Sequence, residues 1–260
     1  MSVAKDASST AVERALAILE AVAQRSGGMT NSEISRRLRI PKSSTSYILR
    51  TLERHGYLHR EQPSGKYRLG LKVLDLSRQA LGGLDVKEAA LPVLKQLAER
   101  NHLTAHLAIL DHGEAVYVEK VDAPGFIKMD TWVGRRLPVH ATSVGKALVA
   151  YLPEAEIKAI LKERGLKKLT SKTITTHAEF LRELERIRAQ GYAVDDEENN
   201  LGVRCLGAPV FDRFGKVEAA VGVSGTTSQI DKVSLPKIAH LVIQAAQKIS
   251  HQLGYHTAAR

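Results

Sequence analysis

Residues 30–68 read TNSEISRRLRIPKSSTSYILRTLERHGYLHREQPSGKYR, and this stretch decides the fold of the amino-terminal part of the chain. It opens with a capping-box pattern, because the Thr30 hydroxyl and the Glu33 carboxylate can satisfy free amides at a helix start. Ile34 and Leu38 then lie four residues apart on one apolar face. Pro41 ends this helix and opens the next one. The pattern predicts two short helices joined by a tight turn.

The second helix, from about Lys42 to His55, has two faces of opposite character. One face has the spacing expected of residues that pack in a core, and it consists of Thr45, Ile48, Leu49 and Leu52. The other side, at steps of four, three and four, carries Ser43, Tyr47, Arg50 and Arg54. Small hydroxyls and free amides at a helix start can contact phosphates, and longer side chains can reach base edges. This helix is therefore predicted to lie in the major groove of DNA.

A two-stranded wing is expected after this helix. Gly56 ends the helix, residues 57–60 and 66–69 are predicted strands, and residues 62–65 (QPSG) form the turn between them. Basic side chains near the tip suit contact with a minor groove or with phosphates. The alternative is a small helical domain with an ordinary solvated basic face. The residues predicted to contact DNA are Arg14, Lys42, Ser43, Ser44, Thr45, Tyr47, Arg50, Arg60, Lys66 and Arg68.

The positive charge is concentrated in the same part of the chain. The whole chain carries +10 at pH 7. Residues 1–80 contribute 14 Lys+Arg and 7 Asp+Glu, whereas the other 180 residues contribute 24 and 21. Release of counterions from DNA phosphates favours this uneven distribution.

Length and composition set further bounds. A chain of 260 residues suits a small domain followed by a larger one with its own core. The single cysteine, Cys205, excludes an intramolecular disulfide framework and fits a reducing compartment. No apolar run is long enough to span a membrane, and the first ten residues lack the apolar segment of a signal peptide. A cytoplasmic protein is expected.

Helices are expected on both sides of the winged segment. The first, at residues 11–24, begins after Thr10 and carries Arg14, which is either a phosphate contact or an ordinary exposed arginine. A linking helix is expected over residues 71–81, ended by Gly82-Gly83, and another helix over residues 86–100.

From Leu103 onward the pattern changes to strands separated by helices. Strands are expected over 104–110, 115–121, 127–133, 192–195, 203–211 and 217–223. Helices are expected over 143–151, 154–164, 177–189 and 231–252. This order predicts an α+β fold, in which a winged helix-turn-helix is joined by linker helices to a domain with one antiparallel sheet.

Several segments of the larger domain carry a specific resemblance. Residues 191–198 (GYAVDDEE) are followed, after six residues, by residues 205–212 (CLGAPVFD), and residues 134–147 read GRRLPVHATSVGKA. With PKSS at residues 41–44 and KYRLG at residues 66–70, these segments resemble the IclR family of bacterial transcriptional regulators. The resemblance covers about residues 10–252.

The resemblance implies a division into a winged helix-turn-helix at residues 10–70, a linker helix at 71–84 and a GAF-like effector-binding and oligomerisation domain at 85–255. It also implies homodimers or tetramers and control of genes for the catabolism of small organic or aromatic acids. Repression is the commoner mode in that family. By matching motif positions, the implied effector pocket contains Phe126, Met129, Leu137, Ser143, Val144, Asp195, Cys205 and Ser224. The backbone amides of Ser143 and Val144, before a helix expected near Gly145, suit a small anion.

Two positions depart from the family pattern. Tyr47 stands where family members often carry arginine, so one DNA contact is either missing or replaced by the tyrosine hydroxyl. Gly222 stands where relatives that respond to glyoxylate and pyruvate carry a hydroxyl. We expect the missing side chain to open space for a bulkier or less polar acid.

Several single residues allow an alternative interpretation. Cys205 has no histidine at a recognisable nucleophile spacing, which favours pocket lining or core packing. His102 and His106 lack a third metal ligand nearby and are expected to be structural or surface residues. Within the acidic run 195–198, only Asp195 is expected to point inward. No metal, cofactor or catalytic site is therefore expected.

The sequence favours a regulator over an enzyme. The leading prediction is a sequence-specific transcriptional regulator whose grip on double-stranded operator DNA changes with a small-molecule effector. The alternative is a metabolite-binding module or an enzyme whose winged helix makes protein contacts. The basic first third of the chain discriminates between them, because an enzyme has no need for it.

Overall fold

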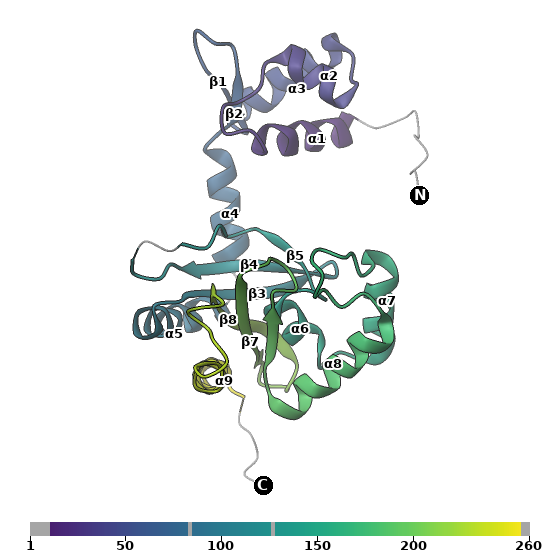
Figure 1. Ribbon diagram of the computed structural model, residues 1–260. Coiled ribbons are helices and arrows are strands. Elements are labelled where there is room, and N and C mark those ends of the chain that lie inside the picture. Colours follow the sequence, from purple (N-terminus) through teal and green to yellow (C-terminus); the bar gives the residue numbers. More distant parts are fainter. Residues whose placement is uncertain (1–10, 83–84, 126–127, 256–260) are drawn as a thin grey trace. The chain divides into compact units, whose positions relative to one another are not determined.

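The protein forms two compact units, residues 1–83 and residues 84–260, in a computed structural model (Figure 1). The structure describes residues 11–82, 85–125 and 128–255. Each unit has its own hydrophobic core.

The first unit is a winged helix. Its helices are α1 (Ala11–Ala23), α2 (Asn31–Leu38), α3 (Lys42–Arg54) and α4 (Lys72–Gly82), and its wing consists of β1 (Leu58–Arg60) and β2 (Tyr67–Leu69). The predicted capping box is present at the start of α2. Glu33 accepts a hydrogen bond of 2.7 Å from the Thr30 amide, and the Thr30 hydroxyl accepts one of 3.3 Å from the Glu33 amide. The two predicted helices and the wing are confirmed.

The core of this unit combines apolar side chains of α1, α2, α3 and the wing. Ile18 of α1, Ile34 of α2 and Leu49 of α3 are completely buried, with Leu58 of the wing beside them. The strands β1 and β2 pair antiparallel, and Leu58 lies opposite Leu69. This packing fixes α3 so that its polar side faces outward.

The second unit contains one antiparallel six-stranded sheet, in the order β5-β4-β3-β8-β7-β6. Its strands are β3 (Thr104–Asp111), β4 (Glu114–Val121), β5 (Arg136–Pro138), β6 (Ala193–Asp196), β7 (Val203–Phe211) and β8 (Val217–Thr226). Together with the helices, this sheet confirms the predicted α+β fold.

Helices cover both faces of the sheet (Figure 1). One face is covered by α5 (Asp85–Asn101) and α9 (Leu235–Gln252), and the other by α6 (Ser143–Val149), with α7 (Glu154–Arg164) and α8 (His177–Gln190) beyond it. Gly207 on β7 lets α6 approach closely, because a Cβ there would come within 2.8 Å of the Ser143 carbonyl carbon. The start of α6 therefore lies directly on the sheet.

Three predicted elements differ from the structure. The strand expected over residues 127–133 is wrong: residues 128–135 are irregular, and the edge strand β5 begins only at Arg136. The helix expected over residues 143–151 begins at Ser143 as predicted, with the Thr142 hydroxyl capping the Gly145 amide at 3.3 Å, but it ends at Val149. The last helix begins at Leu235, because the Asp231 carboxylate holds residues 231–234 in a turn.

None of the helices in the described ranges is both long enough and apolar enough to cross a membrane.

Candidate nucleic-acid interface and ligand cavity

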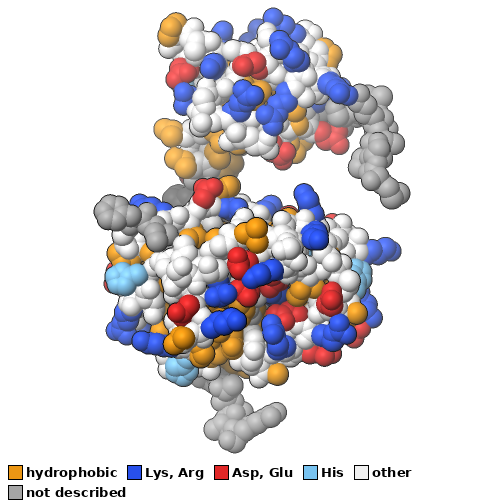
Figure 2. Space-filling view, in the orientation of Figure 1, with side chains coloured by type: hydrophobic (Ala, Val, Ile, Leu, Met, Phe, Trp, Pro, Cys, Tyr) orange, Lys and Arg blue, Asp and Glu red, His pale blue; other side chains and the backbone are white. Residues whose placement is uncertain are grey.

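The recognition helix α3 separates its buried and exposed residues sharply. Ile48 and Leu49 are buried against α1 and α2, whereas Lys42, Ser43, Tyr47 and Arg50 are exposed and Ser44 is half-buried. Tyr47 is 68% exposed, so its side chain does not pack in the core of this unit and is available to contact a binding partner. Figure 2 shows Lys and Arg side chains spread over the visible face of this unit.

The backbone at the start of α3 has free donors. Pro41 occupies the cap position and makes no side-chain cap hydrogen bond. The first amides of a helix have no partner within it, so those of Lys42 and Ser43 can bind phosphate oxygens together with the Lys42 ammonium.

Thr45 does not belong to this surface. It is completely buried, and its hydroxyl donates to the Pro41 carbonyl oxygen at 3.1 Å. The expectation that Thr45 contacts DNA is therefore wrong, because its side chain packs in the core at the spacing that Ile48 and Leu49 share.

The wing presents its basic residues in different ways. Lys66 is half-buried, and the Arg60 guanidinium lies 5.8 Å from the Tyr67 ring centre. Arg68 binds the Ser26 carbonyl oxygen at 2.9 Å and forms an ion pair of 3.4 Å with Glu61, so part of its bonding capacity stabilises the wing. Arg14 lies half-buried on α1.

A cleft of about 620 Å³ lies where α2, α3 and the wing meet. Lys42, Arg50 and Arg60 line it together with Ser46, Ser32 and Ser64, which the sequence analysis did not single out. Basic side chains from α3 and from the wing thus converge on one concave surface.

The second unit contains a cavity of about 370 Å³ above the start of α6. Seven of the eight predicted effector residues line it: Met129, Leu137, Ser143, Val144, Asp195, Cys205 and Ser224. Phe126 lies outside the described residues. The lining also includes residues that sequence reasoning missed: Tyr117, Lys128, Asp130, Thr131, Arg135, Thr142, Asn199, Asn200 and Val203.

Strand register brings the polar residues of the cavity together. Asp195 on β6 is paired with Cys205 on β7, and Cys205 is paired with Ser224 on β8. Residues directly opposite each other on neighbouring strands point to the same face. Three residues far apart in the sequence therefore form one row at the floor of the cavity.

Burial controls the charge of this row. Asp195 is 2% exposed, and loss of water raises the pKa of its carboxyl to about 7, although the Glu198 amide and the Lys146 ammonium oppose the rise. Burial likewise raises the pKa of the Cys205 thiol, with the Asp195 carboxylate adding to the effect. Cys205 is thus a neutral lining thiol rather than an activated nucleophile.

A turn at the end of β6 is fixed by the same carboxylate. Asp195 Oδ1 accepts hydrogen bonds from the amides of Glu198 at 2.8 Å and Asn199 at 3.2 Å. Behind it, the fully buried Lys146 of α6 forms ion pairs of 2.6 Å with Glu198 and 3.4 Å with Glu183. These contacts hold Asn199 and Asn200 at the cavity wall.

The opposite wall is the irregular segment at residues 128–135. Lys120 of β4 donates to the carbonyl oxygens of Met129 at 3.0 Å and Thr131 at 2.8 Å. His106 bonds the Thr131 hydroxyl at 2.8 Å and stacks on Tyr117 with ring centres 4.3 Å apart. Burial lowers the pKa of His106 to about 3, so its ring is neutral.

The space expected beside Gly222 is absent. A Cβ at this position would meet the Leu206 carbonyl oxygen at 2.7 Å and the Val144 side chain at 2.8 Å. The expectation of an opened pocket for a bulkier or less polar acid is therefore wrong: the Val144 side chain fills the place.

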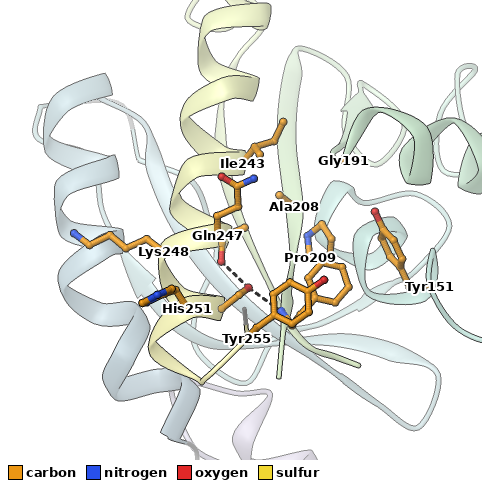
Figure 3. A pocket seen from close by; sticks show the side chains of 12 residues that line it. Tyr151, Gly191, Ala208, Pro209, Ile243, Gln247, Lys248, His251 and Tyr255 are labelled. Carbon is orange, nitrogen blue, oxygen red and sulfur yellow. Dashed lines mark hydrogen bonds between the residues drawn. The ribbon is translucent and has the colours of Figure 1, made fainter. Parts of the chain in front are cut away.

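A second hollow, of about 720 Å³, lies between α9 and the end of β7 (Figure 3). Its wall carries the aromatic side chains of Tyr151, Phe211 and Tyr255. The Ser250 hydroxyl joins the two elements, accepting from the Phe211 amide at 2.9 Å and donating to the Ala246 carbonyl oxygen at 2.8 Å. No acidic side chain is found among the described residues that line this hollow.

The two histidines considered as a metal pair have different surroundings. His106 is buried and bonded to Thr131, whereas His102 is exposed in a left-handed backbone conformation. Within the ranges that the structure describes, no group of three His, Cys, Asp or Glu side chains could hold a metal ion.

A winged helix with an exposed basic recognition helix, in one chain with a separate unit enclosing a polar cavity, defines the class of ligand-responsive DNA-binding regulators. Family models identify the group within that class. Residues 11–62 match the IclR helix-turn-helix domain, and residues 78–251 match the model described as bacterial transcriptional regulator IclR C-terminal. The chain belongs to the IclR family, and it is a DNA-binding transcriptional regulator rather than an enzyme.

Similar proteins cover almost the whole chain. The HTH-type transcriptional regulator XynR of Escherichia coli strain K12 is 38% identical over 94% of this chain and 97% of its own length. KdgR of the same strain is 36% identical over 95% and 94%. Among solved structures, IclR of Thermotoga maritima has a TM-score of 0.80 and 32% identity, covering 94% of this chain and 98% of its own.

Proposed function

We propose that the protein is a cytoplasmic repressor that binds operator DNA as a homodimer and that a small organic acid in the second unit modulates this binding. The observation that carries the proposal is the arrangement of α3. One side is locked into the core by Ile48 and Leu49, and the other presents Lys42, Tyr47 and Arg50 beside free amides.

The DNA-binding residues of this proposal are those predicted from the sequence, without Thr45. Arg50 and Tyr47 lie where side chains reach base edges in the major groove. Lys42 and the amides at the start of α3 suit phosphates, as do Arg60 and Lys66 of the wing. Ser46 joins them from the wall of the cleft between α3 and the wing.

A homodimer is supported by uncovered apolar side chains on the first unit. Val12 and Leu16 are one turn apart on α1 and are 67% and 55% exposed. Leu71 and Leu74, at the start of α4, are 80% and 65% exposed. Neighbouring apolar side chains left uncovered, as in each of these two pairs, suit an interaction surface. A two-fold dimer would place two recognition helices in successive major grooves, about 34 Å apart.

Effector control requires a connection between the cavity and the junction of the two units. Lys120 holds the cavity wall through Met129 and Thr131, and the neighbouring Glu119 forms an ion pair of 3.4 Å with Lys87. Lys87 lies in the first turn of α5, shortly after the junction. An acid that binds one arrangement of this wall better than another shifts the population and thereby the operator affinity. One relative, AllR of Escherichia coli, is a transcriptional repressor by name, which favours repression here as well.

The test is binding of the full-length protein to its own upstream DNA across a salt series. Between about 50 and 200 mM salt, a protein with six to ten phosphate contacts loses roughly 10³–10⁵ in affinity. A flat response would contradict the proposal, as would equal affinity for an unrelated duplex at every salt concentration. Lys158→Ala, a change in an exposed side chain of α7, serves as the control and should leave the salt slope unchanged.

A further inference from the structure

We propose that the effector is a hydroxylated aliphatic carboxylate, with its carboxylate held by Lys128 and Arg135 and its hydroxyl groups held at the Asp195 end of the cavity. This inference rests on the proposed function of the second unit as a sensor. It deepens that function by naming the ligand class and two residues that select it.

Two cations of the cavity lining, Lys128 and Arg135, can accept a ligand carboxylate as a partner. Lys128 is exposed and Arg135 is half-buried. Among the residues that the structure describes, the Arg135 guanidinium contacts neutral groups, the Asp130 carbonyl oxygen and the Trp132 ring, whose centre is 4.9 Å away. Among the described residues, no carboxylate lies within ion-pair distance of either cation, although Asp130 also lines this end. A ligand carboxylate would supply the missing partner, and a guanidinium binds it with two parallel hydrogen bonds.

The other end is built for hydroxyl groups. Asp195 uses one carboxyl oxygen for the amides of Glu198 and Asn199, so its position is fixed. Ser224, Asn199 and Asn200 line the same end and offer both donors and acceptors. Alcohol groups donate and accept at once, so they can satisfy this mixed set, whereas a second carboxylate would face the buried Asp195 carboxyl.

Tyr117 lines the same cavity as Lys128, Arg135 and Asp195. Burial raises the pKa of its phenol, and the charges of Arg135 and Asp195 both act on it, in opposite directions. A cavity of about 370 Å³ suits a molecule of a few carbon atoms.

An aromatic acid fits this lining poorly. Tyr117 is the one aromatic side chain among the described lining residues, and it is already stacked on His106. Ten of the other fifteen described lining residues have polar side chains: Lys128, Asp130, Thr131, Arg135, Thr142, Ser143, Asp195, Asn199, Asn200 and Ser224. A ring would leave several of these groups without partners, and sites built for hydroxyl groups reject analogues that lack them.

Matched probes test the ligand class. Thermal unfolding of the full-length protein would be measured with gluconate and glycerate, with their uncharged counterparts sorbitol and glycerol, and with benzoate and 4-hydroxybenzoate, all at equal concentration. A ligand bound only by the folded state raises the melting temperature. We expect stabilisation by at least one hydroxylated carboxylate and none by its uncharged counterpart or the benzoates. Fluorescence of Trp132, the single tryptophan of the chain, gives a second readout because its ring lies against Arg135.

Two variants test the assigned residues. Arg135→Gln and Lys128→Gln should each weaken binding of the stabilising acid by about ten- to a hundredfold, whereas Lys158→Gln on α7 should not. Stabilisation by the benzoates alone, stabilisation by none of the six compounds, or unchanged affinity in both cation variants would overturn the inference. Operator binding is measured on the same preparations: if it persists, only the ligand assignment fails, and if it is absent, the proposed function fails as well.

Discussion

A substitution of Arg50 should distinguish DNA binding from effector sensing most clearly, because it should affect the first and not the second. Arg50 is exposed on α3, within the basic cleft, and belongs to the other unit from the cavity. Arg50→Ala should weaken operator binding by about 1–3 kcal/mol, because it removes a side chain that reaches base edges or phosphates. Titration of labelled operator with the variant measures this loss.

The control for Arg50→Ala is the effector response. Thermal stabilisation by a bound acid should match that of the unaltered protein, because Arg50 is not one of the residues that line the cavity. A loss of stabilisation together with intact operator affinity would reverse the assignment of the two sites.

Asp195 should make stability depend on pH in an unusual direction. Its pKa in the folded chain is about 7, above the ordinary value of 3.8, because burial penalises the charged form. The folded chain therefore holds this proton to higher pH than the unfolded chain does. This contribution to stability is complete below about pH 4 and is lost as the pH rises to about 7, with about 1.4 kcal/mol for each unit of pKa difference.

Asp195→Asn isolates that contribution. The amide oxygen can still accept from the Glu198 and Asn199 amides, but the side chain no longer titrates. Relative to the variant, the unaltered protein should lose several kcal/mol in free energy of unfolding between pH 4 and pH 7, followed by Trp132 fluorescence in denaturant. Parallel pH profiles for the two proteins would show that Asp195 has an ordinary pKa.

At single positions, the local sequence pattern predicts whether a side chain is buried better than it predicts whether the side chain contacts DNA or a ligand. Thr45 fell on the apolar spacing of α3 and is buried there, although its hydroxyl had suggested DNA contact. Lys128 and Arg135 escaped notice because their place at the cavity depends on Lys120, which holds the wall from another strand. Periodicity carries no information about such long-range bonds.

At the scale of elements, the contact between α6 and the sheet depends on Gly207. A Cβ there would come within 2.8 Å of the Ser143 carbonyl carbon and 2.9 Å of the Val144 amide nitrogen, both of them backbone atoms. Gly207→Ala should therefore push α6 away and lower the stability of the second unit by about 1–3 kcal/mol. The expected fall in its melting temperature is several degrees, since 1 kcal/mol corresponds to roughly 2–4 °C at this size.

The matched control for Gly207→Ala is Ala159→Ser, which also adds one heavy atom but at an exposed position on α7. It should change stability by less than about 0.5 kcal/mol. Equal melting temperatures for Gly207→Ala and the unaltered protein would mean that α6 is not held as closely as the structure indicates.

Elements with strong periodicity or clear end signals were predictable, and the cavity wall was not. Residues 154–164 and 203–211 were predicted with the bounds that α7 and β7 have, because polar or turn residues flank clear apolar patterns. Residues 127–133 alternate like a strand, but the edge strand begins only at Arg136, and Gly134 and Arg135 already make backbone hydrogen bonds to Tyr117 of β4. Side-chain hydrogen bonds from Lys120 and His106 hold this segment in place of the strand pairing that the alternation predicted.

At the scale of the whole molecule, charge and apolar surface assign different tasks to the two units. The excess of basic residues lies in residues 1–80, and the uncovered leucines Leu16, Leu71 and Leu74 lie in the same unit. Electrostatic attraction alone gives binding that is independent of sequence. Two rigidly spaced recognition helices add specificity, because half-sites must then match their separation. A regulator with one weakly selective helix per chain therefore gains from a dimer.

Leu16→Glu combined with Leu74→Glu tests this dimer. Burial of each leucine in an interface contributes about 1.5–3 kcal/mol, and a carboxylate at the same place opposes association. The double variant should have a lower mass by light scattering at micromolar concentration and should bind a two-half-site operator no better than a single half-site. Val233→Glu, which alters an 87% exposed side chain of the second unit, is the control and should keep the mass and operator preference of the unaltered protein. If the double variant also keeps both, the apolar residues of α1 and α4 do not form the interface, and the spacing of the recognition helices must be set elsewhere in the chain.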